Sequence, residues 1–293
     1  MDLMICGTCG VQFDSHAIKS CKICDDPRQY VAEEGQWFTT LRELQDSKKY
    51  TNIFTKDKYN SGVIAIRTEP QVAIGQRAFL LRAPTGNLLW DCITYLDDET
   101  VRRINALGGI AAIVISHPHY FSTALHWAEA FSCKVYVSTE DGQWLTRRGE
   151  AHVLWEGQEM EFLDGQFLAV KVAGHFPGSS VLLWKNEKKL FVADSVMVVP
   201  SGVYHVDRPP GTASFAFMWS YPNMVGGCVL IPLSPEAVHG IWTAVAGLDF
   251  EDAHSAFAGR DARGDAKKRL LESAQLFVRS IGYADHAIHS ERT

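Results

Sequence analysis

Runs of hydrophobic residues alternate with helical patterns along most of the chain. Apolar or alternating runs predict strands at residues 62–67, 76–82, 87–92, 109–116, 134–137, 167–172, 180–184 and 189–193. Helical periodicity predicts helices at residues 39–46, 97–106, 123–131, 140–146, 235–246 and 262–281. The continuous apolar run at 109–116 is typical of a strand that is buried on both faces. Strands that alternate with helices predict a layered α/β or α+β fold.

Composition narrows the class of protein. The chain has 293 residues, of which 46% are hydrophobic and 21% charged, so it can bury a sizeable core. No apolar run approaches the roughly 18 residues of a membrane span. The first residues, MDLMICGTCG, lack the basic and apolar regions of a signal peptide. We therefore expect a cytoplasmic protein that does not associate with a membrane.

The net charge indicates which classes of partner the protein can bind. Lys plus Arg is 28 and Asp plus Glu is 34, which gives a net charge of −6 at pH 7. A general nucleic-acid binder needs a basic surface, so this balance does not favour nucleic acid. We expect a small-molecule substrate, and the sequence leaves the oligomeric state open.

Four of the seven cysteines form two C-x-x-C pairs within the first 24 residues, at Cys6, Cys9, Cys21 and Cys24. In a reducing compartment such pairs indicate a tetrahedral metal site. So short a stretch cannot bury a core, and the metal would supply its folding energy. We expect a rubredoxin-like or zinc-ribbon-like module over residues 1–30 and a second domain over 31–293. Zinc is favoured, and iron remains possible. The other three cysteines, at positions 92, 133 and 228, are expected to be small buried hydrophobes.

Chemistry-bearing residues follow several predicted strands. His117 and His119 form a His-x-His pair directly after the apolar run 109–116, and a Gly-rich turn after the next group of strands presents His175. Asp194 and Asp91 each follow a strand-like segment. Because α/β folds place their sites at strand ends, these residues are expected to converge on one edge of the sheet, where His117 and His119 are close enough to share one metal ion.

These motifs, in this order, resemble the metallo-β-lactamase fold superfamily over roughly residues 60–260. The motifs are Asp91, Ser116-His117-Pro118-His119, Gly174-His175-Phe176-Pro177-Gly178-Ser179 and Asp194. The resemblance implies an αββα sandwich with a metal site at one edge. It also implies a metal-activated hydroxide that attacks an ester, thioester, amide or phosphodiester.

The sequence departs from the family motif, His-x-His-x-Asp-His, at the last two positions. Phe121 stands at the acidic position and Ser122 at the last histidine, and both positions bind the second metal in the family. Neither residue is a good zinc ligand. The resemblance therefore implies a mononuclear site that consists of His117, His119 and His175, with Asp194 as fourth ligand or as the residue that orients the water.

Other residues near the motifs have two interpretations each. Tyr120 is either a catalytic donor to an oxyanion or a packing residue. His126 lies on the following helix and is either close to the site or solvated. A last family histidine is expected in the C-terminal helical region, where His254 and His239 are the candidates.

Two further segments are candidates for the pocket. The first is a polar loop that holds Tyr204, His205 and Asp207, which can line the mouth of the pocket. The second is an aromatic run that forms either a substrate wall or core, with members Phe215, Phe217, Trp219 and Tyr221.

Together these features predict a metal-dependent hydrolase that acts on an ester, thioester, lactone or related small organic substrate. We expect two zinc ions per chain, one bound by four cysteines and one by three histidines and Asp194, with iron possible at either. The alternatives are a catalytically weak binding member of the fold and a mononuclear iron oxygenase, because two histidines and a carboxylate bind Fe(II).

Overall fold

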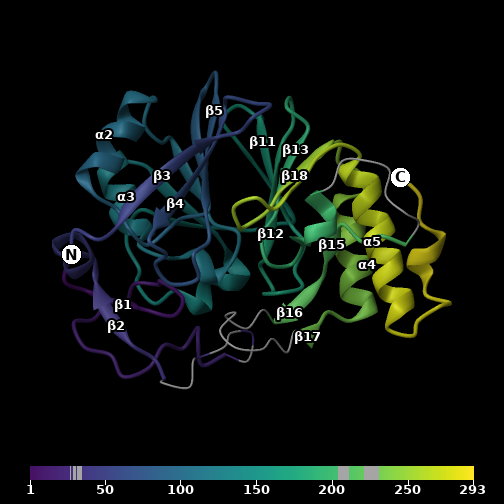
Figure 1. Cartoon of the computed structure of the whole chain (residues 1–293), viewed down its shortest axis with the longest axis horizontal. Helices are drawn as coiled ribbons and strands as arrows, with labels where there is room; N and C mark the ends of the chain where they lie inside the picture. Colours follow the sequence, from purple (N-terminus) through teal and green to yellow (C-terminus); the bar gives the residue numbers. More distant parts are fainter. Residues whose placement is uncertain (27, 29–30, 32–34, 204–210, 221–230) are drawn as a thin grey trace. The chain divides into compact units, whose positions relative to one another are not determined.

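The computed structural model describes residues 1–26, 28, 31, 35–203, 211–220 and 231–293. These residues form two units (Figure 1). The first unit contains residues 1–156, and the second contains the described residues of 157–221 and 229–293. Within the described ranges, no helix is both long enough and apolar enough to cross a membrane.

The sheet of the first unit has, among the described residues, seven strands in the order β3-β4-β5-β6-β7-β8-β9. The strands are β3 (Thr51–Lys56), β4 (Val63–Glu69), β5 (Ala78–Ala83), β6 (Gly86–Trp90), β7 (Ala112–Val114), β8 (Lys134–Ser138) and β9 (His152–Trp155). Pairing is antiparallel from β3 to β6 and parallel from β6 to β9. Parallel neighbours need crossover connections, which α2 (Asp98–Ala106) and α3 (Ala124–Phe131) provide. These crossovers place the loops after β6 and β7 at the same end of adjacent strands.

The N-terminal segment is tied into the first unit. Strand β1 (Met4–Cys6) pairs antiparallel with β2 (Phe38–Thr40), and α1 (Leu41–Asp46) follows directly. Helix α1 begins at a capping box, in which the Thr40 side chain accepts from the Glu43 backbone N–H and the Glu43 side chain accepts from Thr40. Further along, the Thr94 hydroxyl donates to the Gly10 carbonyl at 3.0 Å. A domain boundary near residue 30 stays a prediction.

The second unit has its own sheet, with the order β10-β11-β12-β13-β18-β19 within the described part of the chain. The strands are β10 (Glu159–Phe162), β11 (Phe167–Lys171), β12 (Ser180–Trp184), β13 (Lys189–Phe191), β18 (Asp252–His254) and β19 (Asp261–Ala262). Helices α4 (Pro235–Val245) and α5 (Ala266–Ser280) lie side by side in Figure 1 and bury apolar faces in one core with this sheet. Shorter strands pair as β14 (Met197–Val198) with β15 (Phe215–Ala216) and β16 (Met218–Ser220) with β17 (Ile231–Pro232).

The short 3₁₀ helices are η1 (Pro118–Tyr120), η2 (Thr139–Trp144), η3 (Pro200–Val203) and η4 (Ala287–Ser290). The predicted helix at 140–146 is wrong in type, because the segment forms η2, a 3₁₀ helix that contains Gly142. The predicted strand at 109–116 shortens to β7, since Gly109 adopts a positive φ of 73°. The predicted helix at 262–281 begins only at Ala266, because the residues before it form β19.

Candidate metal centres

The four N-terminal cysteines form a compact, buried cluster in the first unit. The Sγ atoms lie 3.6 Å apart between Cys6 and Cys24, and 3.8 Å apart between Cys9 and Cys21. All four Sγ atoms lie within 4.8 Å of one another. A disulfide requires about 2.05 Å, whereas two ligands of a tetrahedral ion at about 2.3 Å from sulfur lie about 3.8 Å apart. The donor set therefore fits a bound metal ion and excludes a disulfide between these pairs.

The pKa values of the cluster follow from the same geometry. Hydrogen bonds from Cys21 and then Cys24 lower the pKa of Cys6, and the Cys9 backbone N–H adds to the effect. Burial is the main cause that raises the pKa of Cys9. A metal that binds such a cluster takes thiolates as ligands and therefore displaces the remaining thiol protons.

His117 lies in the loop after β7, and a buried carboxylate anchors this loop. The Ser116 backbone N–H donates to Asp91 Oδ1 at 2.7 Å, and the Ser116 hydroxyl lies 2.9 Å from His117 Nδ1. Asp91 follows β6, and its own N–H donates to the Val114 carbonyl at 2.8 Å. With Nδ1 engaged by Ser116, His117 can ligate a metal through Nε2. The acid at the end of an apolar strand is thus explained by the backbone that it holds.

His119 and Tyr120 belong to η1, which directly follows His117. The rings of His117 and His119 have centroids 5.2 Å apart and stand at 81° to each other. The Tyr120 ring meets the His117 ring edge-on at 5.4 Å, and the residue is 2% exposed. Tyr120 therefore packs against a candidate ligand, and its catalytic role stays a prediction.

His175 is presented in the second unit by a turn that needs glycine. Gly174 has a φ of +87°, a conformation that favours glycine. A Cβ at this position would approach Leu233 Cδ1 to 3.0 Å. His175 Nδ1 lies 2.7 Å from the Trp219 carbonyl, so Nδ1 carries the proton and Nε2 is the ligating nitrogen.

Asp194 lies on the same side of His175 as this nitrogen. The distance between His175 Nε2 and Asp194 Oδ2 is 3.6 Å, and the Asp194 side chain is 14% exposed. The neighbouring Ser195 hydroxyl accepts the His175 backbone N–H at 3.1 Å and donates to the Ala173 carbonyl. Each unit therefore brings two of the predicted ligands together, His117 with His119 and His175 with Asp194.

The remaining candidate histidines have other partners. His254 ends strand β18, which lies between α4 and α5 in the sequence. Its ring stacks on Phe191, its Nδ1 lies 3.2 Å from Asp261 Oδ1, and Arg263 lies 3.3 Å from its Nε2. Because the guanidinium can only donate, it engages the lone pair of His254 Nε2. His239 Nε2 lies 3.0 Å from Glu291 Oε1.

The aromatic run mostly serves the core of the second unit. Phe215 and Phe217 are buried in that core, and the Phe217 ring meets Phe277 edge-on. Trp219 is half-buried, and its carbonyl holds His175. The sequence could not reveal this last role, because any residue has a carbonyl. Four further candidates lie outside the described residues, namely Tyr204, His205, Asp207 and Tyr221.

Two described cysteines lie outside the cluster, and burial raises the pKa of both thiols. Cys92 is buried, and burial raises its pKa well above the ordinary value. Burial likewise raises the pKa of Cys133 to about 11. Thiols with raised pKa values are poor nucleophiles at neutral pH. Cys228 lies outside the described residues.

A family model for the metallo-beta-lactamase superfamily matches residues 73–243, which is more than half of the chain. The chain belongs to the metallo-beta-lactamase superfamily. A Bacillus subtilis (strain 168) relative, named Uncharacterized protein YmaE, is 37% identical over 287 residues, which cover 96% of this chain and 97% of the relative. The predicted family and fold class are therefore confirmed, and all four predicted His and Asp ligands fall within the matched range.

Solved structures of this superfamily share the fold. The structure of TMB-1 is 12% identical with a TM-score of 0.54, and the match covers 79% of this chain and 99% of that one. FIM-1 from Pseudomonas aeruginosa, solved in a mono-zinc form, is 13% identical with a TM-score of 0.50, over 78% of this chain and 96% of that one. At these identities the likeness shows the metallo-beta-lactamase fold alone.

Proposed function

We propose that the protein is a metal-dependent hydrolase with one catalytic metal, held by His117, His119, His175 and Asp194. A structural zinc at the four N-terminal cysteines accompanies it. The substrate is an ester, thioester, lactone or related small organic molecule. A reducing compartment such as the cytoplasm suits the four thiol ligands.

The proposal rests on one observation, the orientation of the histidine rings within each unit. Ser116 engages His117 Nδ1, and the Trp219 carbonyl accepts from His175 Nδ1. Metal-binding histidines characteristically bind through one nitrogen while the other is held by such a partner. Three imidazoles and a carboxylate are also a donor set that zinc prefers. The residues present therefore fit a bound zinc ion.

The absence of a second catalytic metal is supported by the residues that follow the His-x-His pair. Phe121 is apolar, and the Ser122 hydroxyl donates to the Cys92 carbonyl at 3.0 Å. Neither side chain is available as the carboxylate or imidazole that a second ion requires. FIM-1, which shares the fold, has been solved in a mono-zinc form.

The chemistry divides between the metal and the chain. A zinc ion held by these residues would supply hydroxide at neutral pH, because zinc lowers the pKa of bound water to near 7. Asp194 would complete the ligand set or orient the water, and its partial exposure leaves it accessible to solvent. Tyr120 holds the His117 ring from the side. Asp91 keeps the ligand loop in place through Ser116.

Metal analysis tests the proposal. Purified protein should carry two zinc ions per chain, and His119→Ala and Cys9→Ser should each remove about one. His239→Ala is the matched control and should keep both ions, because His239 contacts Glu291. Iron at the histidine site would overturn the hydrolase assignment. A site without metal would favour a ligand-binding role for the fold.

A substrate panel then tests the reaction. Esters, thioesters, lactones and phosphodiesters are assayed with wild type, His119→Ala and His239→Ala. The proposal expects turnover of at least one carbonyl substrate that is lost in His119→Ala and kept in His239→Ala. Equal rates in wild type and His119→Ala would refute it.

A further inference from the structure

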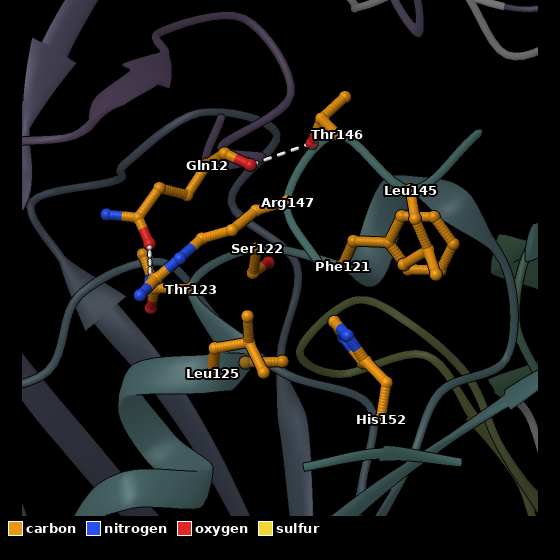
Figure 2. A pocket seen from close by; sticks show the side chains of 10 residues that line it. Gln12, Phe121, Ser122, Thr123, Leu125, Leu145, Thr146, Arg147 and His152 are labelled. Carbon is orange, nitrogen blue, oxygen red and sulfur yellow. Dashed lines mark hydrogen bonds between the residues drawn. The ribbon is translucent and has the colours of Figure 1, made fainter. Parts of the chain in front are cut away.

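Gln12 joins the cysteine cluster to the His-x-His loop inside the first unit. It lies between Cys9 and Cys21 in the sequence and is 2% exposed. Its backbone N–H donates to the Ser122 carbonyl at 3.0 Å, and its own carbonyl accepts from Thr146 at 2.7 Å. Its side chain accepts from Arg147 Nη1 at 2.5 Å and lies 3.2 Å from His126 Nε2. Figure 2 shows the bonds to Thr146 and Arg147 at the wall of a pocket beside Ser122.

Ser122 is the place where the ligand loop turns towards α3. It follows His119 by three residues and has a φ of +44°, which side-chain-bearing residues rarely adopt. Such a conformation persists only where neighbouring groups hold it. The Ser122 hydroxyl donates to Cys92 O, and its carbonyl accepts from Gln12. Gln12 also meets His126, which lies in the first turn of α3, so it contacts both sides of the turn.

The cysteine cluster fixes the segment that carries Gln12. The Gly10 N–H donates to the Cys6 carbonyl at 2.8 Å, and the Cys6 N–H donates to the Val11 carbonyl at 3.0 Å. Residues 6–11 therefore form a closed turn around two of the four thiol ligands. Ile5 and Val11, on either side of this turn, are fully buried in the first unit. A metal bound by all four thiolates would join this turn to Cys21 and Cys24 and add to its rigidity.

We propose that Gln12 is a positioning residue for the loop of His117 and His119, and that the metal at Cys6, Cys9, Cys21 and Cys24 thereby sets the metal affinity of that loop. In the family motif His-x-His-x-Asp-His, the last two positions bind a second metal. Here those positions are Phe121 and Ser122. The Ser122 carbonyl accepts from the Gln12 N–H, and the Gln12 side chain contacts Arg147 and His126. The inference rests on the proposed metal site at these histidines.

Metal competition tests the role of Gln12. Zinc or cobalt is titrated against a chelator, and absorption of the cobalt form separates the thiolate site from the histidine site. Gln12→Ala keeps the backbone bond to Ser122 but removes the side-chain contacts with Arg147 and His126, so α3 is no longer held against the turn. Loss of a group that orients metal ligands weakens binding by about 10–100-fold, and we expect Gln12→Ala to weaken the histidine site by about tenfold. Gln71→Ala is the control and should stay within about twofold, because Gln71 is exposed and its side chain donates to the nearby Ala73 carbonyl.

Thermal unfolding distinguishes a Gln12 that positions the metal ligands from a Gln12 that only stabilises the fold. If Gln12→Ala lowers Tm but leaves the affinity of the histidine site unchanged, the positioning role is overturned. Gln12→Glu keeps the length and the acceptor for Arg147, and it should restore most of the affinity.

A second variant tests the link to the cysteine metal. Cys9→Ser should weaken metal binding at the histidine site about as much as Gln12→Ala does. The double variant with both substitutions should bind metal at that site no more weakly than Cys9→Ser alone, because both substitutions act through the Gln12 contacts. An unchanged histidine site in metal-depleted Cys9→Ser would overturn the link. If wild type binds only one metal and His119→Ala changes nothing, the proposed function itself has failed. If wild type binds two and Gln12→Ala alone is silent, only this inference has failed.

Discussion

Replacement of Asp91 is the sharpest test of how the ligand loop is held. Asp91 accepts the Ser116 backbone N–H at 2.7 Å, and both residues are at most 2% exposed. Asp91 also has a φ of +63°, which Asn and Asp tolerate better than Ala. Asp91→Asn retains an acceptor oxygen and the backbone preference, whereas Asp91→Ala loses both.

The magnitude follows from these two losses. A buried N–H without an acceptor costs about 1–3 kcal/mol, and a left-handed conformation costs Ala about 1–2 kcal/mol. Asp91→Ala should therefore destabilise the protein by about 2–5 kcal/mol. Asp91→Asn exchanges a charged acceptor for a neutral one, so we expect a cost of about 1 kcal/mol. Asp164 has a similar φ of +55° but is exposed, and Asp164→Ala should cost only the backbone part, about 1–2 kcal/mol.

Urea unfolding, followed by far-UV circular dichroism, gives the free energies of unfolding for the three variants. Hydrogen exchange of residues 112–121 reports the loop directly, and it should be faster in Asp91→Ala than in Asp91→Asn. If Asp91→Ala and Asp91→Asn are equally stable and exchange alike, the carboxylate does not anchor this loop. The same result would remove the reason given for an acid at the end of an apolar strand.

Three further predictions concern other parts of the chain. Gly174→Ala should lose about 2–4 kcal/mol and the metal at the histidine site, since φ is +87° and the Cβ would crowd Leu233; full metal content and an unchanged Tm would contradict this. Burial, with help from nearby arginines, lowers the pKa of His126 and of His152 from 6.5 to about 4. The unfolded chain thus binds more protons between these values, so stability should fall as pH drops from about 6.5 to about 4. His152→Gln should flatten that slope in unfolding measured at each pH, and an unaltered slope would argue against burial of this imidazole. Thr40→Ala removes the cap of α1 and should cost about 1 kcal/mol in urea unfolding, whereas Ser61→Ala, at an exposed position, should cost less than about 0.5 kcal/mol.

Elements with a strong pattern of their own could be predicted from the sequence. Helix α2 begins after Asp97, whose side chain accepts from the Thr100 N–H, as its capping pattern indicates. Strands β3, β9, β10 and β18 were missed. Each mixes exposed and buried positions or is very short, and such strands exist because a neighbouring strand pairs with them. Strand β18, for example, is defined by its parallel partner β13.

The candidate site shows the same division. The cysteine spacing predicted a cluster, and the His-x-His motif predicted a ligand pair. In both motifs the residues of a pair are two or three positions apart, so they lie close together in space. Gln12 had no local signal of this kind, since its partner His126 lies 114 residues away. The His254 environment was equally hidden, because Arg263 meets it only through the pairing of β18 with β19.

By itself, the sequence determined the family, the candidate ligand residues within the matched motifs and the two positions at which residues other than the family's second-metal ligands stand. These features depend on side-chain identity, which the sequence states directly. Only the tertiary structure decided which nitrogen of His117 and His175 can bind a metal, why Asp91 is an acid and what holds Ser122 in its turn. These features depend on backbone N–H and C=O groups of distant residues, as in the bond between His175 and Trp219 across 44 positions. Every residue carries such groups, so only the fold selects which of them meet.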